Sequence, residues 1–179
     1  MNTISDTDYD WGNNAISNGE NKPGIWRTLT ADEWGYLLFD RPNATKLVGA
    51  GTVNGQNGLF ILPDYYTDEE VSFISFADKN AQHDGDYWYY GIKEAFSNNT
   101  YSIEEFKLLE SKGVVFLPSS EFRMKDTFKA DMTEGYYWTG TPFDEEKAYI
   151  VYIFSHGLRS KTEHYRSNGF SVRLVCDII

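Results

Sequence analysis

The chain has 179 residues, a length typical of one domain, and its 27 acidic residues outnumber its 16 basic ones to give a net charge of −11. Nucleic-acid binders and proteins held on anionic membranes need a positive surface, so we expect neither nucleic acid nor lipid as a partner. No run approaches the roughly 20 apolar residues of a membrane-spanning helix, and the polar N-terminus shows no export signal, so direct membrane insertion is not expected.

Aromatic side chains make up 17% of the chain. Tyr and Trp provide large and rigid contact areas, so this excess indicates an aromatic-packed β core or, in part, a binding surface. The single cysteine, Cys176, has no partner for an internal disulfide. At the predicted end of a strand, it is interpreted as a small buried hydrophobic residue.

The first predicted element is a helix. Residues 1–25 are rich in Asn, Asp, Ser and Gly without periodicity, so an irregular segment is predicted there. Thr30-Ala31-Asp32-Glu33 has the pattern of a capping box, in which Thr caps the first turn and Glu reaches back. Apolar residues follow at helical spacing, which predicts a helix over 31–40.

A hairpin is predicted next. Asn-Gly pairs within 54–58 adopt positive φ at little cost, so 47–53 and 59–62 are expected to pair. Residues 64–101 mix acids, aromatics and asparagines, which predicts mostly loop, with one helical turn near 69–73.

The C-terminal half predicts a second helix and then strands. A second capping box at Ser102–Glu105 and a helix-ending Gly113 predict a helix over 103–112. The aromatic and β-branched runs that follow favour antiparallel strands with one buried face and one exposed aromatic face. These runs are Gly135–Thr141, Ala148–Phe154 and Gly169–Val175.

Further motifs upstream complete a recognisable order. They are Trp26–Trp34, Val53–Asp64 and Gly113–Pro118. Together with the C-terminal runs, they make residues from about 10 to 175 resemble the Fibrobacter succinogenes major paralogous domain family. This family is abundant in gut Bacteroidales and is similar to formylglycine-generating enzymes and to the variable proteins of diversity-generating retroelements.

The resemblance implies an α+β fold of the C-type-lectin-like kind, forming a single domain over 1–179. Two helices would pack on short antiparallel sheets with much irregular loop. Family members commonly carry a leader and a segment upstream of the counterpart of Asp10-Trp11-Gly12, so this sequence is expected to be either a trimmed piece of a longer chain or a member that lacks that segment. The resemblance also implies an extracellular or cell-surface location in a gut bacterium, or a place in a phage particle.

Catalytic residues are not expected. Formylglycine-generating enzymes depend on a pair of reactive thiols, whereas this chain has 1 Cys. Adjacent carboxylates such as Glu104-Glu105 are interpreted as solvated, because a glycosidase needs two carboxylates that face each other across a cleft. An enzyme with an acidic aromatic cleft for carbohydrate is the least favoured alternative.

No cofactor and no transition-metal site are expected, because His83, His156 and His164 are not spaced as metal ligands. The tripeptides that hold calcium in C-type lectins are absent, which disfavours calcium-bridged sugar binding. A structural calcium ion in the acidic loop Asp84-Gly85-Asp86 is the alternative that remains open.

A ligand-binding face is predicted on the C-terminal strands. Alternation puts Val151 and Ile153 on one face and Tyr152 and Phe154 on the other. In retroelement variable proteins this part of the fold is the diversified binding surface, so the resemblance implies ligand contacts between 139 and 168. The predicted contact residues are Phe143, Asp144, Tyr152, Phe154, His156, Arg159, His164, Tyr165 and Arg166. They combine aromatic anchors with ionic hydrogen-bonding groups, as binding hot spots do.

The alternative for Tyr152 and Phe154 is packing beneath the middle segment.

We expect a non-enzymatic module that binds a protein receptor or a glycan, in the manner of an adhesion protein. This expectation includes a variable protein that a retroelement diversifies, although the C-terminal segment has few of the asparagines that such diversification favours. The alternative from another class is a structural or assembly subunit of a surface appendage or phage particle, self-associating through an open strand edge.

Overall fold

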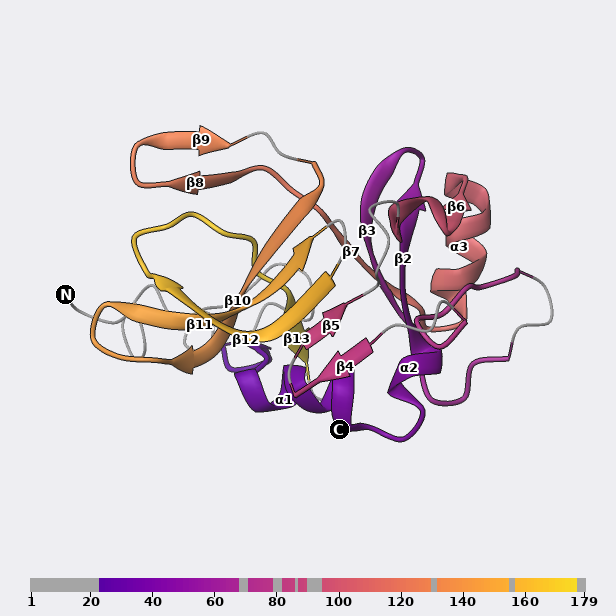
Figure 1. The fold of residues 1–179 in the computed structure, drawn as a ribbon, viewed down its shortest axis with the longest axis horizontal. Helices are drawn as coiled ribbons and strands as arrows, with labels where there is room; N and C mark the ends of the chain where they lie inside the picture. Colours follow the sequence, from indigo (N-terminus) through magenta and orange to yellow (C-terminus); the bar gives the residue numbers. More distant parts are fainter. Residues whose placement is uncertain are drawn as a thin grey trace.

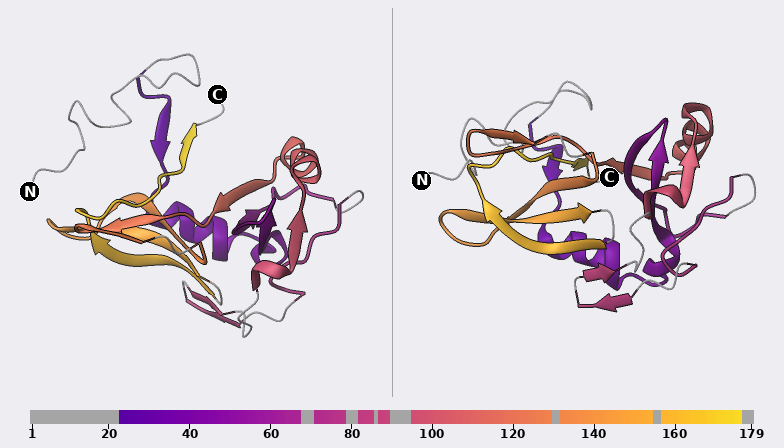
Figure 2. Two further views of the ribbon diagram at one scale, coloured as in Figure 1. Left: turned by 90° about the horizontal axis from the view of Figure 1, so that it is seen from above. Right: turned by 45° about the horizontal axis from the view of Figure 1, so that its top comes forward.

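The structure, a computed structural model, has an α+β architecture with few helices and mostly strands (Figure 1). It describes residues 23–67, 71–78, 82–85, 87–89, 95–129, 132–154 and 157–176. A five-stranded and a four-stranded sheet lie side by side in Figures 1 and 2. Within these described ranges, no helix is long and apolar enough to cross a membrane.

The five-stranded sheet comes mainly from the C-terminal part of the chain, and its paired strands are antiparallel. In spatial order it contains β10 (Glu134–Pro142), β11 (Lys147–Phe154), β12 (Gly157–Tyr165), β5 (Tyr87–Tyr89) and β4 (Gln82–Asp84). The strands predicted at 135–141 and 148–154 are confirmed. Strand β12 was not predicted, because its buried positions include Gly and Ser, which hid the alternation.

The four-stranded sheet contains the predicted hairpin. Its spatial order is β6 (Asn99–Tyr101), β2 (Val48–Val53), β3 (Gln56–Ile61) and β7 (Val115–Pro118). The turn is the pair Asn54-Gly55 with φ of 49° and 81°, the left-handed conformation that suits a two-residue hairpin. The hairpin is therefore confirmed, with a shorter turn than 54–58, and β6 adds to β2 in parallel.

The first helix is confirmed over its predicted range. It begins as α1 (Ala31–Gly35) and continues as the π-helix η1 (Tyr36–Asp40), whose end is marked by a hydrogen bond from the Arg41 N–H to the Tyr36 carbonyl. A short helix α2 (Ala44–Leu47) then leads into β2, so the strand begins one residue later than predicted.

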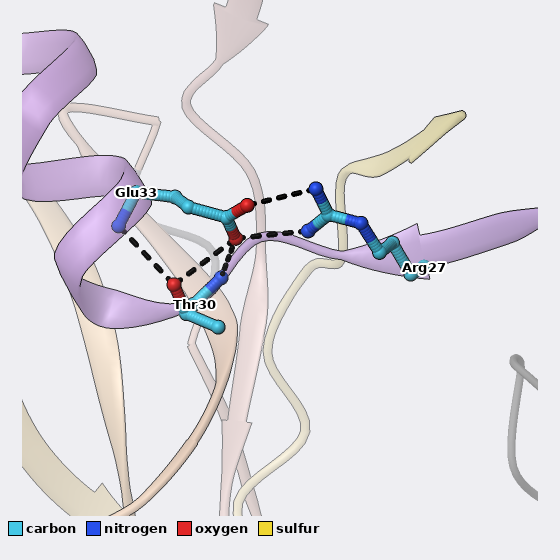
Figure 3. Close-up of polar contacts among 3 residues, drawn as sticks. All are labelled: Arg27, Thr30 and Glu33. Carbon is cyan, nitrogen blue, oxygen red and sulfur yellow. Dashed lines mark hydrogen bonds and ion pairs between the residues drawn. The ribbon is translucent and has the colours of Figure 1, made fainter. Parts of the chain in front are cut away.

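Glu33 of the α1 capping box also binds the strand that precedes the helix. The Glu33 carboxylate accepts the Thr30 N–H at 2.7 Å and the two terminal nitrogens of Arg27 at 2.7 and 2.8 Å (Figure 3). Arg27 lies on β1 (Trp26–Thr28), so this bidentate pair joins β1 to the helix start. The hydrogen bond from Arg27, followed by those from Thr30, lowers the pKa of Glu33 from 4.5 to about 2.

We expect Glu33→Gln to lower the free energy of unfolding by about 1 kcal/mol near neutral pH, a value kept small because the pair is partly exposed. Because the folded-state pKa is lowered, this contribution is complete above pH 4.5 and is lost as the pH falls toward about 2. Urea unfolding across this range measures it, with the exposed Glu121→Gln as the matched control. If the free energies of unfolding of Glu33→Gln and wild type still differ near pH 2, the ionised Glu33 carboxylate is not the source of the difference.

The second predicted helix is α3 (Ile103–Ser111), with the expected capping box of Ser102 and Glu105. Gly113 follows with a φ of 88°, as a helix-ending glycine should. Leu109 is fully buried and packs with Phe60, Tyr101 and Phe106, so α3 covers one side of the four-stranded sheet.

The two sheets share one hydrophobic core. Trp34 and Leu38 of the first helix pack with Leu59 of β3 and with Val151 and Ile153 of β11. All of these side chains are at most 1% exposed, and a fully buried Leu or Ile contributes about 1.5–3 kcal/mol. The first helix thus fixes the five-stranded sheet relative to the four-stranded one.

Several predictions about the remaining segments need correction. The middle segment forms β4, β5, the 3-10 helix η2 (Ala95–Ser97) and β6, and residues 71–73 are not helical. Residues 69 and 70 of the predicted helical turn lie outside the described ranges. A further hairpin, β8 (Phe122–Met124) with β9 (Thr127–Lys129), follows β7.

The predicted last strand is shorter than expected. Only β13 (Leu174–Cys176) is a strand, paired with β1, while Gly169 and Ser171 form isolated bridges. Figure 2 shows β1 and β13 projecting from the body of the molecule. Cys176 is therefore exposed, and the prediction of a buried thiol is wrong.

Candidate ligand-binding face

One face of the β10–β11–β12 sheet carries a row of stacked aromatic rings. Tyr87, Phe154, Tyr152, Tyr136 and Phe170 follow one another, and we call these five residues the aromatic row. Successive centroids lie 6.0, 4.7, 4.6 and 4.8 Å apart, with interplanar angles from 12° to 28°. The row arises because Tyr136 and Tyr152 are directly opposite in the β10–β11 register.

The row alternates between buried and half-buried rings. At the Phe170 end, Phe122 of β8 and Phe170 itself pack over Tyr136, which is only 6% exposed. At the other end, Tyr152 and Tyr87 are half-buried, and Phe154 between them is only 8% exposed. Phe170 is also half-buried, so the accessible rings are Tyr152, Tyr87 and Phe170, and Tyr152 and Tyr87 form the accessible end on the β5 side.

Arg159 lies at this accessible end. It is opposite Tyr152 in the β11–β12 register, and its guanidinium carbon is 4.6 Å from the centroid of the Tyr87 ring. The side chain is exposed, so it offers charged donors beside two aromatic rings. An arginine next to aromatic anchors is a frequent composition of binding hot spots.

Glu134 fixes the hydroxyl groups of the row. Its two carboxylate oxygens accept the Tyr136 hydroxyl at 2.9 Å and the Tyr152 hydroxyl at 2.5 Å. Burial, with the hydrogen bonds to Tyr152 and Glu134, raises the pKa of Tyr136 well above its ordinary value. The Tyr136 hydroxyl consequently stays neutral and donates a proton to a bond that orients the row.

His164 borders the row from β12. Its ring meets Tyr136 and Phe170 edge-on, at 6.0 and 5.2 Å between centroids. Burial lowers the pKa of His164, and Asn168 Nδ2 lies 3.2 Å from its Nδ1. The imidazole is therefore neutral near pH 7 and acts as a packing and hydrogen-bonding group.

The other predicted contacts lie at the β10–β11 hairpin. The Asp144 carboxylate accepts the N–H groups of Glu146 and Lys147 at 2.8 and 2.7 Å. Arg166 donates to the carbonyls of Lys147 and Asp144 at 3.1 and 2.8 Å. These two predicted residues thus hold the hairpin loop in shape.

Phe143 and Tyr165 flank the same hairpin with 47% and 50% exposure. The Lys147 ammonium lies 5.8 Å from the Phe143 ring centroid and 5.4 Å from that of Tyr165. They form an exposed patch that is separate from the aromatic row.

The structure therefore divides the predicted contact residues into two groups. Tyr152, Phe154, Arg159 and His164 belong to the aromatic row or border it. Phe143, Asp144, Tyr165 and Arg166 gather at the hairpin, and His156 lies outside the described residues. Of the two interpretations of Phe154, packing beneath the middle segment holds and exposure is wrong, because β5 brings Tyr87 onto its ring.

Sequence reasoning missed Tyr87, Glu134, Tyr136 and Phe170. Tyr136 alternates within the predicted strand 135–141, so pairing that strand with 148–154 in register would have revealed its stack on Tyr152. The run Tyr87-Trp88-Tyr89 carried a strand signal that the prediction of a loop set aside. Phe170 was placed in a strand that begins only at Leu174.

This face combines aromatic rings with charged and polar side chains. Both Glu134 oxygens accept tyrosine hydroxyls, and the face supplies rings, an exposed guanidinium and a neutral imidazole. Within the described part of the chain, no three His, Cys, Asp or Glu side chains gather as a metal-binding group. The proposed calcium loop at 84–86 lies partly outside the described residues.

Comparison of this chain with known protein families, characterised proteins and solved structures gives no match.

Proposed function

We propose that the chain is a non-enzymatic, C-type-lectin-like module that binds a protein or a glycan through the accessible end of the aromatic row. The observation that carries the proposal is the grouping of Tyr152, Tyr87 and the exposed Arg159 on one sheet face. Stacked rings suit the apolar faces of sugars or side chains, and the guanidinium suits acceptor groups beside them.

The proposal extends to display on a bacterial surface or phage particle, and to a retroelement-diversified variable protein. The support is the resemblance of the sequence to the Fibrobacter major paralogous domain family, which rests in part on the runs of this chain that form β10 and β11. Diversification requires a rigid frame beneath changeable contacts. Buried Val151 and Ile153 form such a frame on the opposite side of β11 from Tyr152.

The alternative of an assembly subunit needs an open strand edge. The outer edge of β10 does not supply one, because Trp138 N–H donates to the Ser171 carbonyl and Ser171 N–H donates to that of Tyr136. Gly140 N–H also donates to the Leu29 carbonyl. These bonds occupy the edge at several points and disfavour self-association through β10.

A binding screen against glycan arrays and cell-surface proteins tests the proposal. We expect Arg159→Ala to weaken the wild-type signal at least about tenfold, because truncating a hot-spot side chain removes about 2 kcal/mol. The fold should be unaffected, since Arg159 is exposed. Melting curves of both proteins verify this.

Matched controls separate this face from the rest of the surface. Lys107→Ala removes a cation from α3 and Tyr65→Ala removes a ring that is 76% exposed, and neither residue is near the aromatic row. Both variants should bind as wild type does. Equal losses in these controls, or a signal that Arg159→Ala leaves unchanged, would overturn the proposed site.

A further inference from the structure

The β8–β9 hairpin is a basic segment of an acidic chain. Its residues Phe122–Lys129 contain one acid, Asp126, whereas the whole chain carries a net charge of −11. Its three cations are Arg123, Lys125 and Lys129, and all three are exposed. None of them forms an ion pair within the part of the chain that the structure describes. Figure 1 shows β9 at the margin of the molecule, outside β8, so this charge faces solvent.

Strand β8 attaches the hairpin firmly to the sheet that carries the aromatic row. Phe122 is 5% exposed, and its ring centroid lies 4.4 Å from that of Tyr136 and 6.1 Å from that of Phe170. On the side of β8 away from β9, the Arg123 N–H donates to the Gly169 carbonyl at 3.0 Å, and the Gly169 N–H donates to the Arg123 carbonyl at 2.8 Å. Both sides of β8 are therefore occupied, and β9 is the open edge of the hairpin.

Phe128 presents its backbone groups at this open edge. It lies opposite Arg123 in the β8–β9 register. Because both backbone groups of Arg123 bond Gly169, the two opposite residues form a non-hydrogen-bonded pair, and the N–H and C=O of Phe128 point away from β8. Neither group has a partner among the residues that the structure describes. The Phe128 side chain is also 67% exposed, on the same face as that of Arg123.

The turn of the hairpin holds a lysine in an unfavourable backbone conformation. Lys125 has a φ of 53°, in the left-handed region that Gly and Asn adopt more readily. The Lys125 side chain is exposed, so burial in the core does not offset this cost. A use for its positive charge accounts for the residue, because Lys125 and Lys129 then place a cation on each side of Phe128.

We propose that the edge of β9 binds an acidic, extended segment of another protein, which adds to β9 as an antiparallel strand. The segment's residue opposite Phe128 would exchange two backbone hydrogen bonds with it. An apolar side chain on that residue would lie beside the Phe128 ring, and acidic neighbours would face Lys125 and Lys129. This edge is separate from the accessible end of the aromatic row, so the inference does not depend on the proposed function.

The acidic nature of the partner follows from charge complementarity. Screening limits interactions between exposed charges to about 8–10 Å at physiological salt, so the local charge of the hairpin matters more than the net charge of the chain. Pairing of β9 with β9 of a second copy would bring two sets of the same three cations together, which disfavours a symmetric dimer through this edge.

NMR titration of the isotope-labelled full chain with a short capped peptide of alternating Glu and Val tests the proposal. We expect saturable shifts centred on the Phe128 amide, with a Kd of roughly a millimolar or tighter. Hydrogen exchange of that amide should slow severalfold when the peptide is bound, because the N–H then donates to the peptide.

Two further peptides separate charge from strand addition. Replacing Glu by Lys introduces repulsion, and N-methylating the valines removes the donors of one peptide edge, so each should bind at least about tenfold more weakly. Equal binding of the N-methylated peptide would show a charged patch without strand addition and overturn the proposal. Shifts centred elsewhere, self-association of the free chain that the peptide displaces, or the absence of saturable shifts would overturn it too.

Variants at exposed positions of β9 leave the core intact. Phe128→Ala removes the ring and keeps the outward N–H, whereas Phe128→Pro also removes that N–H without breaking a bond to β8. We expect Phe128→Pro to bind at least about fivefold more weakly than Phe128→Ala, followed at the Lys129 amide. Equal affinities of the two variants would show that the backbone of β9 is not the binding edge.

A charge variant and its matched control complete the test. Lys129→Gln should weaken binding of the Glu–Val peptide about threefold, the usual effect of one exposed ion pair. Lys107→Gln makes the same change on α3 and should bind as wild type does. Equal losses in both variants would show that the peptide responds to the overall charge of the chain and not to the hairpin.

Discussion

Replacing Phe154 by Ala is expected to lower the free energy of unfolding by about 3 kcal/mol, within the usual range for a buried phenylalanine. Phe154 is 8% exposed and stacks between Tyr152 and Tyr87, at 4.7 and 6.0 Å between ring centroids. Its removal leaves a cavity between β11 and β5. For a chain of this length, the melting temperature should fall by roughly 6–12 °C.

Tyr152→Phe is the informative companion. It keeps the stacking area of the ring and removes the hydroxyl that donates to Glu134 at 2.5 Å. Because Tyr136 still donates to the other Glu134 oxygen, we expect a loss of only about 1 kcal/mol. If both variants melt like wild type, the row is an adaptable surface and Phe154 does not anchor β5 to β11.

The sequence was most informative where chemistry acts locally. Both capping boxes lie within four consecutive residues, so Thr30 and Ser102 could be assigned as helix starts without knowing what the helices contact. The Asn54-Gly55 turn is equally local, because its positive φ values depend only on these two residues. These signals predicted the first helix, α3 and the β2–β3 hairpin.

The candidate site depends on pairings between distant segments, which local patterns do not specify. Tyr87 meets Phe154 only because β5 adds to the free edge of β12. Likewise, the isolated bridges of Gly169 and Ser171 bring Phe170 over Tyr136, although no strand forms there. Alternation could therefore assign Tyr152 and Phe154 to one face, while their exposure depended on partners far along the chain.

Contacts between distant segments also decide where the four-stranded sheet tolerates a side chain least, which is at a glycine. Gly51 of β2 pairs with Asn99 of β6, and a Cβ at Gly51 would overlap the backbone carbonyl of Asn99. Asn99 cannot move away easily, because its amide donates to the carbonyls of Ala50 and Ile74 at 2.9 Å and accepts the Ile74 N–H at 2.8 Å. We expect Gly51→Ala to lose about 3 kcal/mol of unfolding free energy.

Gly135→Ala is the matched control, since this buried strand glycine has room for a Cβ, with the nearest atom, Ser119 Cα, at 3.4 Å. It should change stability by less than about 1 kcal/mol, because alanine also reduces the freedom of the unfolded chain. Urea unfolding of the two variants gives the comparison directly. If Gly51→Ala loses no more unfolding free energy than Gly135→Ala, β6 does not lie against β2 as described. A much larger loss in Gly51→Ala would establish that the absence of a side chain at Gly51 lets Asn99 join β2 to the 71–74 segment.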